Sequence, residues 1–347
     1  MSIFNSPHYS NHERIIYINE PHVGLNAIIA IHDRTLGPAL GGCRFWNYRN
    51  EEEGLNDVLR LSKGMTYKAA LANVNLGGGK AIIFADSLNK KTPEIMLAMG
   101  HAINELNGGY ITGPDIGTGV KDMTIIHKNT PYVIGVEEAS GGYGDPAIST
   151  SLGVFMGIKA AVQFKWATSD LKGIKILVQG LGHVGMNLCE LLHGEKATLI
   201  VSDIDIKKVQ EAEKRYEATS VAPEKLYDIE ADIFSPCAFG SVINDKTISK
   251  LNFSIIAGGA NNQLENDIHG KYLFENEIIY LPDYVVNGGG LIQVAAEWYK
   301  EPYEVYGPKV KKVYDSCLKI IKKSYNENID TNQAANLIAE NKIKAKQ

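Results

Sequence analysis

The feature that most limits how this chain can fold is the glycine-rich segment Gly180–Gly185, because of the residues on either side of it. An apolar run at 175–179 precedes it, with the composition of a buried parallel strand, and a helical pattern follows it. A second apolar run, 198–201, leads to Asp203. A strand, a GxGxxG turn, a helix, a strand and an acidic residue in this order are typical of a dinucleotide-binding unit. The sequence therefore predicts a doubly wound α/β domain of Rossmann type.

The three glycines of this turn have separate tasks. Gly180 lets the chain turn sharply, Gly182 lets the backbone approach a pyrophosphate at the helix N-terminus, and Gly185 lets the helix pack on the strand. Asp203 can accept hydrogen bonds from both ribose hydroxyls and would repel a 2′-phosphate, so NAD is favoured over NADP. The residues between the glycines are predicted to lie in the same cofactor loop: Leu181, His183 and Val184. A simpler interpretation of His183 is an exposed filler position of the motif.

A second unusual stretch lies in the N-terminal half, where two lysines stand near a run of glycines. Gly77–Gly79 directly precede Lys80, and the β-like run 81–84 follows, so we expect a glycine turn and a strand from Lys80. A lysine held beside a buried strand is partly desolvated, which favours its neutral form. A neutral amine can act as a general base. The structural alternative is a glycine turn with a surface lysine.

Length and periodicity predict two domains. The chain has 347 residues, which is long for one hydrophobic core. Segment 138–149 is rich in Gly, Ser and Pro and lacks periodicity, so it is the candidate linker. We expect an N-terminal α/β substrate domain at 1–140 and a Rossmann domain at 150–307, with helices at about 308–347 packing back on the first domain.

Composition excludes several classes of protein. A net charge of −5 gives no basic surface for nucleic acid. The N-terminus lacks the pattern of a signal peptide, and no apolar run of about 18 residues indicates a membrane span. The histidines have no ligand spacing, so no metal site is expected. The four cysteines are far apart and are interpreted as reduced thiols of a cytoplasmic protein: Cys43, Cys189, Cys237 and Cys317.

Eight segments in register resemble the blocks of one enzyme family. They are IHDRTLGPALGG, KGMTYKAA, NLGGGKAII, YITGPDIGT, VQGLGHVG, SPCAFG, IAGGANNQL and PDYVVNGGG, and the resemblance extends from Ile28 to about Ile343. The family is that of the amino acid dehydrogenases of the leucine, valine and phenylalanine type, relatives of glutamate dehydrogenase. The resemblance implies NAD-dependent oxidative deamination of an L-amino acid to a 2-oxo acid and ammonium, and the reverse reaction. The expected architecture is two α/β domains that face each other across a cleft. Because hydride transfer needs a site without water, we expect the cleft to close about the linker.

Site residues follow from the resemblance position by position. Lys68 corresponds to the lysine that pairs with the substrate carboxylate, Lys80 to the catalytic lysine and Asp115 to its acidic partner. Asn261 resembles the asparagine that links cofactor and substrate. Further residues are expected beside the substrate (Gly41, Gly42, Pro114) or the cofactor (Cys237, Ala238, Asn261, Asn287). Structural alternatives stay open: Asp115 as a turn cap, Asn261 as a left-handed residue after glycines, and Lys68 as a surface lysine.

Two other classes of protein fit the residues less well. Hydroxy acid dehydrogenases generally use a histidine with a carboxylate partner and an arginine for the substrate acid, whereas this chain presents Lys68, Lys80 and Asp115. A non-catalytic NAD-binding regulator would be free to lose Lys80 or Asp115, and both are present.

Substrate and assembly are less constrained. Gly119 stands where many family members have threonine, and Gly288 where alanine is usual. A branched-chain aliphatic substrate is favoured, and an aromatic one is the alternative because 140–142 and 151–162 resemble members that prefer phenylalanine or tryptophan. The chain ends at Gln347, before the longer tail of many leucine-type members, so a dimer is expected first and an octamer second.

Overall fold

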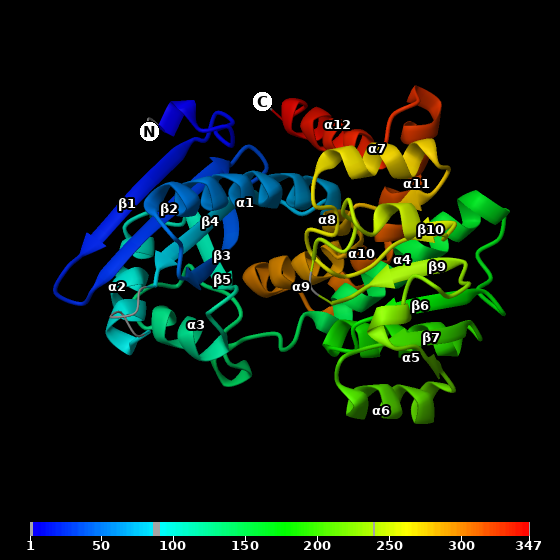
Figure 1. Ribbon diagram of the computed structural model, residues 1–347. Coiled ribbons are helices and arrows are strands. Elements are labelled where there is room, and N and C mark those ends of the chain that lie inside the picture. Colours follow the sequence, from blue (N-terminus) through cyan, green and yellow to red (C-terminus); the bar gives the residue numbers. More distant parts are fainter. Residues whose placement is uncertain (1–2, 86–90, 239, 347) are drawn as a thin grey trace. The chain divides into compact units, whose positions relative to one another are not determined.

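The computed structural model describes residues 3–85, 91–238 and 240–346. The chain forms two compact units (Figure 1). Unit 1 comprises Met1–Gly144, Val294–Glu301 and Ala339–Gln347, and unit 2 comprises Asp145–Gln293 and Pro302–Ile338. The change from one unit to the next after Gly144 falls inside the segment expected as a linker. The helices at about 308–347 were expected to pack on the first domain. Of this segment, residues 339–347 belong to unit 1 and the part up to Ile338 belongs to unit 2.

Unit 1 is built on a five-stranded mixed sheet. Its order is β1-β2-β4-β3-β5, in which β2 pairs antiparallel with β1 and β4, while β3 pairs parallel with β4 and β5. The strands are β1 (Arg14–Glu20), β2 (Leu25–Asp33), β3 (Ala39–Trp46), β4 (Gly77–Phe84) and β5 (Tyr110–Pro114). The helices are α1 (Glu51–Ala72), α2 (Pro93–Asn104) and α3 (Val120–His127), with 3₁₀ turns at Ile3–Asn5 and Glu138–Ser140.

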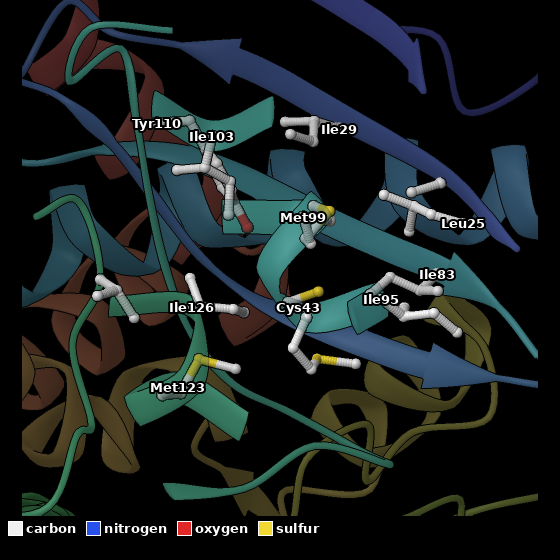
Figure 2. Packing of buried hydrophobic residues seen from close by; sticks show 14 of the residues in the cluster. Leu25, Ile29, Cys43, Ile83, Ile95, Met99, Ile103, Tyr110, Met123 and Ile126 are labelled. Atoms are coloured by element: carbon white, nitrogen blue, oxygen red, sulfur yellow. The ribbon is translucent and has the colours of Figure 1, made fainter. Parts of the chain in front are cut away.

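Helices cover both faces of this sheet and bury two separate cores. On one face, Leu55, Val58 and Leu59 of α1 pack on Ile28 and Ile82. The other face carries the larger core under α2 and α3, part of which Figure 2 shows: Leu25, Ile29, Cys43, Ile83, Ile95, Met99, Ile103, Tyr110, Met123 and Ile126. The connection β3–α1–β4 runs over one face of the sheet, and the connection β4–α2–β5 runs back over the other face. The direction of the chain across the sheet therefore reverses, and in such sheets ligands bind at the carboxyl ends of the strands where this happens, here β3 and β5.

The start of β4 differs from the sequence prediction. Gly77–Gly79 do not form a turn; they are the first three residues of the strand, and Lys80 stands in its middle. A Cβ atom on Gly78 would lie 2.1 Å from Thr66 Oγ1 of α1, and one on Gly79 would lie 2.7 Å from the Tyr110 ring. The glycines therefore let the sheet approach its neighbours on both faces, which a strand of larger residues would prevent.

Unit 2 is built on a six-stranded parallel sheet of order β11-β10-β9-β6-β7-β8, the strand order of a doubly wound Rossmann domain. The strands are β6 (Lys175–Gln179), β7 (Thr198–Ser202), β8 (Thr219–Ser220), β9 (Ile233–Pro236), β10 (Ile255–Ile256) and β11 (Ile279–Tyr280). The helices are α4 (Ala147–Trp166), α5 (His183–Gly194), α6 (Ile206–Tyr216), α7 (Asp267–Glu275), α8 (Asp283–Val286), α9 (Gly288–Tyr299), α10 (Tyr303–Lys311), α11 (Val313–Glu327) and α12 (Thr331–Lys344), with 3₁₀ turns at Pro223–Lys225 and Ile248–Lys250. The last residues of α9 and α12 belong to unit 1.

Helix α4 is long and apolar enough to cross a membrane by length and composition alone. However, 61% of its apolar window is buried inside the fold, where α4 packs against α5 and α11. A helix that is apolar on most of its surface is expected in the core of a domain of this size. We therefore interpret α4 as a core helix of unit 2.

Candidate active site

Lys80 lies at the centre of a buried charged cluster in unit 1. Its side chain is 7% exposed, and its Nζ contacts Oδ2 of Asp115. Burial lowers the pKa of Lys80 to about 7, helped by the Arg44 and Lys68 cations and opposed by Asp57 and Cys43. A substantial fraction of Lys80 is therefore neutral at neutral pH, as a general base requires.

Asp115 reaches Lys80 because the loop after β5 is tightly held. The Thr118 hydroxyl accepts a hydrogen bond from Asp115 N (2.9 Å) and donates one to Cys43 O (2.7 Å). Gly117 adopts φ 80°, and a Cβ there would lie 2.0 Å from Phe45 O. Asp115 Oδ1 also accepts from Ile116 N at 2.5 Å, so the residue does cap its own turn, but its carboxylate is also engaged by Lys80.

The expected substrate glycines have clear packing reasons. A Cβ on Gly42 would lie 2.9 Å from Asp115 Cβ, which is too close. Asp115 can therefore lie over β3 only because residue 42 has no side chain. A Cβ on Gly41 would lie 1.7 Å from Gly79 O, so the two strands meet closely there. Pro114 is exposed at the end of β5. The structure thus brings Gly42, Lys80 and Asp115 together, and the roles of Gly41, Gly42 and Pro114 toward a substrate stay predictions.

Lys68 lies on α1 near the end of that helix and is partly buried. Its charge is among those that lower the pKa of Lys80, so the two amines are within electrostatic reach. Because like charges disfavour each other, the pair can separate into one cation and one base. This arrangement favours the functional interpretation of Lys68 over that of an isolated surface lysine.

Sequence reasoning assigned no role to Arg44, which the structure places in the same cluster. Arg44 Nε donates to Asp115 Oδ1 (3.2 Å), and Arg44 Nη1 donates to Asp57 Oδ2 (2.6 Å). The signal available in the sequence was spacing: Arg44 follows Gly42 by two residues in a strand, so both point to the same face of the sheet. That face carries α1, which contributes Asp57.

The glycine loop of unit 2 has the geometry expected for a pyrophosphate. Gly182 is the N-cap of α5 and provides no side-chain cap, and a Cβ there would meet no described residue within 4 Å. Gly180 has φ 91° and packs on Ala238, while a Cβ on Gly185 would lie 1.9 Å from Gly180 O. An uncapped helix N-terminus with open space before it is suited to an anion.

Asp203 follows β7 and lies beside this loop. Its Oδ2 accepts a hydrogen bond from Leu181 N at 2.5 Å, and its Oδ1 accepts one from Asp205 N at 2.8 Å. The carboxylate is thus fixed next to the turn, with lone pairs remaining on both oxygens. This position fits the predicted role at a ribose.

Asn287 and Asn261 form a pair that is incomplete by itself. Asn287 is 3% exposed and donates from Nδ2 to Asn261 Oδ1 at 2.7 Å, whereas its own buried Oδ1 has no hydrogen-bond partner among the described residues. A buried unsatisfied acceptor costs about 1–3 kcal/mol, which a bound donor such as a carboxamide N–H would offset. The left-handed residue of this segment is Asn262 (φ 54°), so the left-handed interpretation of Asn261 is wrong.

The other predicted cofactor residues are less distinctive. His183 begins α5; its side chain is 83% exposed and its Nδ1 contacts the Asp145 carboxylate. Val184 packs near Gly259, and Cys237 and Ala238 follow β9. Their contacts with a cofactor stay predictions.

One group of potential metal ligands occurs in the described part of unit 2. Ligand atoms of Asp245, Glu265 and His269 lie within 4.8 Å of one another. His269 Nδ1 accepts a hydrogen bond from Asn266 N (3.3 Å), so in a neutral ring the hydrogen is on Nε2, which lies 2.8 Å from Asp245 Oδ1. A protonated Nε2 cannot ligate a metal, and the arrangement is explained as a helix cap.

Together, a Rossmann unit with an open glycine loop and a unit with a buried lysine–aspartate pair define an NAD(P)-dependent oxidoreductase. Residues 12–132 match the family model described as Glu/Leu/Phe/Val dehydrogenase, dimerisation domain, and residues 141–347 match that of Glutamate/Leucine/Phenylalanine/Valine dehydrogenase. The chain belongs to the Glu/Leu/Phe/Val dehydrogenase family. The predictions of this family, of its two-domain α/β fold and of an amino acid dehydrogenase are confirmed.

Individual relatives cover nearly the whole chain. Leucine dehydrogenase of Thermoactinomyces intermedius is 46% identical over 99% of this chain and 94% of its own length. L-tryptophan dehydrogenase of Nostoc punctiforme is 47% identical over 99% of this chain and 96% of its own length. The crystal structure of L-tryptophan dehydrogenase from Nostoc punctiforme superposes with a TM-score of 0.89 at 45% identity, covering 97% of each chain.

Proposed function

We propose that this protein catalyses the NAD-dependent, reversible oxidative deamination of an apolar L-amino acid, with a branched-chain substrate such as leucine favoured. The observation that carries the proposal is Lys80, a buried amine with a pKa of about 7 that faces a carboxylate in a dehydrogenase of the amino acid family. The overall reaction converts amino acid, NAD⁺ and water into 2-oxo acid, ammonium, NADH and a proton.

The residues of unit 2 fit NAD as the cofactor. The uncapped N-terminus of α5 would hold the pyrophosphate, Asp203 the ribose, and the unsatisfied Asn287 Oδ1 the carboxamide. When bound, NAD⁺ accepts the hydride from the substrate Cα. A carboxylate at the ribose position would repel a 2′-phosphate, which supports NAD over NADP.

The side chains of unit 1 account for the remaining steps. Loss of hydride from Cα leaves an iminium carbon, to which a water molecule adds. Neutral Lys80 takes a proton from that water, and the resulting ammonium stabilises the developing alkoxide and carbonyl oxygen. Lys68 stays charged and binds the substrate carboxylate. Asp115 exchanges protons with the substrate nitrogen, which leaves as ammonia and is protonated.

An aromatic substrate is the second candidate, because L-tryptophan dehydrogenase is as similar to this chain as leucine dehydrogenase is. Discrimination among apolar side chains depends on about 1–3 kcal/mol per methylene-sized difference, so family motifs do not separate the two. Kinetics with a panel of amino acids decide between them.

The test is NADH formation at alkaline pH with L-leucine, L-valine, L-isoleucine, L-phenylalanine, L-tryptophan and L-glutamate. The proposal expects the highest kcat/KM with leucine or valine, and none with D-leucine as a control. Fastest turnover of phenylalanine or tryptophan would replace the aliphatic assignment with the aromatic one. Binding of NADH without turnover of any amino acid would contradict the proposed reaction.

Assembly and location belong to the same proposal. The match of residues 12–132 to a dimerisation-domain model supports a homo-oligomer, with a dimer expected first and an octamer as the alternative. A cytoplasmic protein is expected from the free cysteines and the buried position of the apolar helix α4. Sedimentation equilibrium of the purified chain distinguishes dimer from octamer.

A further inference from the structure

Arg44 connects two carboxylates that belong to different elements. Its Nη1 donates to Oδ2 of Asp57 on α1 at 2.6 Å, and its Nε donates to Oδ1 of Asp115 after β5 at 3.2 Å. The Arg44 side chain is 16% exposed and both carboxylates are buried to a similar degree. A planar guanidinium can make two such bonds in fixed directions, whereas a lysine ammonium on a flexible chain acts as a single point charge.

Asp57 is itself held as an anion. Its burial alone would raise its pKa, but the hydrogen bond from Tyr48 and the Arg44 and Arg60 cations outweigh burial, and the pKa of Asp57 is lowered. Tyr48 Oη donates to Asp57 Oδ2 at 2.7 Å, and Arg60 Nη2 donates to Asp57 Oδ1 at 2.9 Å. Asp57 is therefore a fixed, charged anchor on α1 for one end of Arg44.

The other end of Arg44 fixes how the Asp115 carboxylate is rotated. Oδ1 receives hydrogen bonds from Arg44 Nε and from Ile116 N, and Oδ2 is left to contact Lys80 Nζ. We infer that Arg44 is a positioning residue, which bridges Asp57 to Asp115 so that one defined carboxylate oxygen faces the catalytic lysine. This inference rests on the proposed function, because it concerns the same proton-transfer pair.

The position of Arg44 also affects the charge of Lys80. The groups that act on Lys80 are Asp115 after β5, Arg44 and Cys43 on β3, and Asp57 and Lys68 on α1. Without Arg44, a cation near Lys80 is lost, and Lys80 no longer shares the Asp115 carboxylate with a second cation. Both changes favour the protonated amine, so the pKa of Lys80 would rise. Because the neutral amine is the active form, the acidic limb of the pH–rate profile would move to higher pH.

The experiment compares Arg44→Gln, Arg44→Lys and Asp57→Asn with the wild-type enzyme. Arg49→Gln is the matched control, since Arg49 also pairs with a carboxylate of α1, Glu53, but is 84% exposed and outside the cluster. The measurements are kcat, KM for the amino acid, the pH profile of kcat/KM, and Tm. NADH binding shows whether unit 2 is intact, and the cooperativity of the unfolding transition at Tm shows whether unit 1, which carries the substitutions, is folded.

We expect Arg44→Gln to lower kcat by about 10–100-fold, the range for a catalytic group displaced by about 1 Å, with KM changed by less than about threefold. Its acidic limb should move up by about one pH unit. Arg44→Lys keeps the charge without the bridge, so its limb should move less while kcat still falls. Asp57→Asn should move kcat in the same direction, and Arg49→Gln should match the wild type.

A merely structural role gives a different pattern. It would lower Tm, and activity only in proportion to the folded fraction, with the pH profile unchanged in every variant; that pattern, or a kcat of Arg44→Gln within about twofold of wild type, overturns the inference. If Arg44→Gln shows no cooperative unfolding transition, Arg44→Lys and Asp57→Asn decide by the same criteria. A wild-type enzyme without activity on any amino acid contradicts the proposed function instead.

Discussion

The two units form their sites in opposite ways. In unit 1, the site consists of charged side chains brought out of water: Lys80, Asp115 and Arg44. In unit 2, it consists mainly of missing side chains and exposed backbone, at Gly180 and Gly182 before an uncapped helix. A proton-transfer site needs groups whose pKa is shifted, and burial among charges provides the shift. A site for a large anion needs space and N–H donors, which glycine and a helix N-terminus provide.

This difference predicts that substitutions in the charged cluster of unit 1 change rate and pH dependence, while those in the glycine loop of unit 2 change cofactor affinity. It also predicts that unit 1 is the more sensitive to acid, because burial lowers the pKa of His12 and of His32 there. Substitutions in each unit test this contrast, and the largest effect is expected at Lys80.

Lys80→Ala should lower kcat at least about 10²-fold and leave NADH affinity within about twofold, because the proposed general base is lost from a unit that does not contain the glycine loop. Steady-state kinetics and NADH fluorescence titration measure the two quantities. Lys159→Ala, which removes an ion pair with Glu195 in unit 2, is the control and should retain kcat. A near-normal kcat in Lys80→Ala would remove Lys80 from the mechanism.

Unit 1 should lose stability as the pH falls from 7 to 5. Burial and the neighbouring His12 lower the pKa of His32 to about 4, and its Nδ1 bonds Thr66 Oγ1 at 2.8 Å. His32 therefore binds a proton more readily in the unfolded chain than in the folded one. Its contribution to the free energy of unfolding is complete above about pH 6.5 and decreases toward pH 4, with a loss of about 2 kcal/mol at pH 5. Hydrogen exchange of β2 and α1 should accelerate in this range more than that of β6 and α5.

The variant His32→Asn separates this effect from general acid sensitivity. It removes the titrating ring, so the difference in stability between pH 7 and pH 5 should shrink by about 2 kcal/mol. An unchanged pH dependence in this variant would show that other groups control acid unfolding of unit 1.

Gly182→Ala should raise the Kd for NADH about tenfold or more and change Tm little. The added methyl group meets no described residue within 4 Å, and Gly182 has an ordinary φ of −70°, so it should crowd the pyrophosphate that we propose binds at this helix N-terminus. Gly194→Ala at the other end of the same helix also has open space and is the control. Equal NADH affinity in both variants would contradict a pyrophosphate at Gly182.

The smallest effect is expected at the end of the chain. Tyr67 Oη donates to Glu340 Oε1 at 2.9 Å, joining α12 to α1 one residue before Lys68. Glu340→Gln should cost about 1 kcal/mol of stability and raise the substrate KM slightly, without moving the pH profile. A double-mutant cycle with Tyr67→Phe measures the coupling free energy between Tyr67 and Glu340. If the two stability changes are additive, this hydrogen bond does not stabilise the packing of α12 on α1.

Local pattern was sufficient for much of unit 2. The apolar run 175–179 became β6 with the predicted bounds, and the apolar run 198–201 became β7, one residue longer. The GxGxxG spacing also identified the open turn, because turn, strand and helix lie within one continuous stretch of chain. In unit 1, the N-cap Thr92 and the first helical residue Pro93 are local signals of the same kind at the start of α2.

The tertiary structure alone decided how the charged cluster is connected. Arg44 meets Asp115 across 71 residues, and Tyr67 meets Glu340 across 273, distances over which no periodicity in the sequence operates. The extension of β4 to Gly77 depends on α1 pressing against Gly78, and the pair Asn287–Asn261 depends on the register of β10 and β11. The sequence by itself thus determined the residue types and the local elements, whose hydrogen bonds and caps lie within a few residues. Which carboxylate faces Lys80, and which cation holds it there, was decided by the packing of strands and helices far apart in the chain.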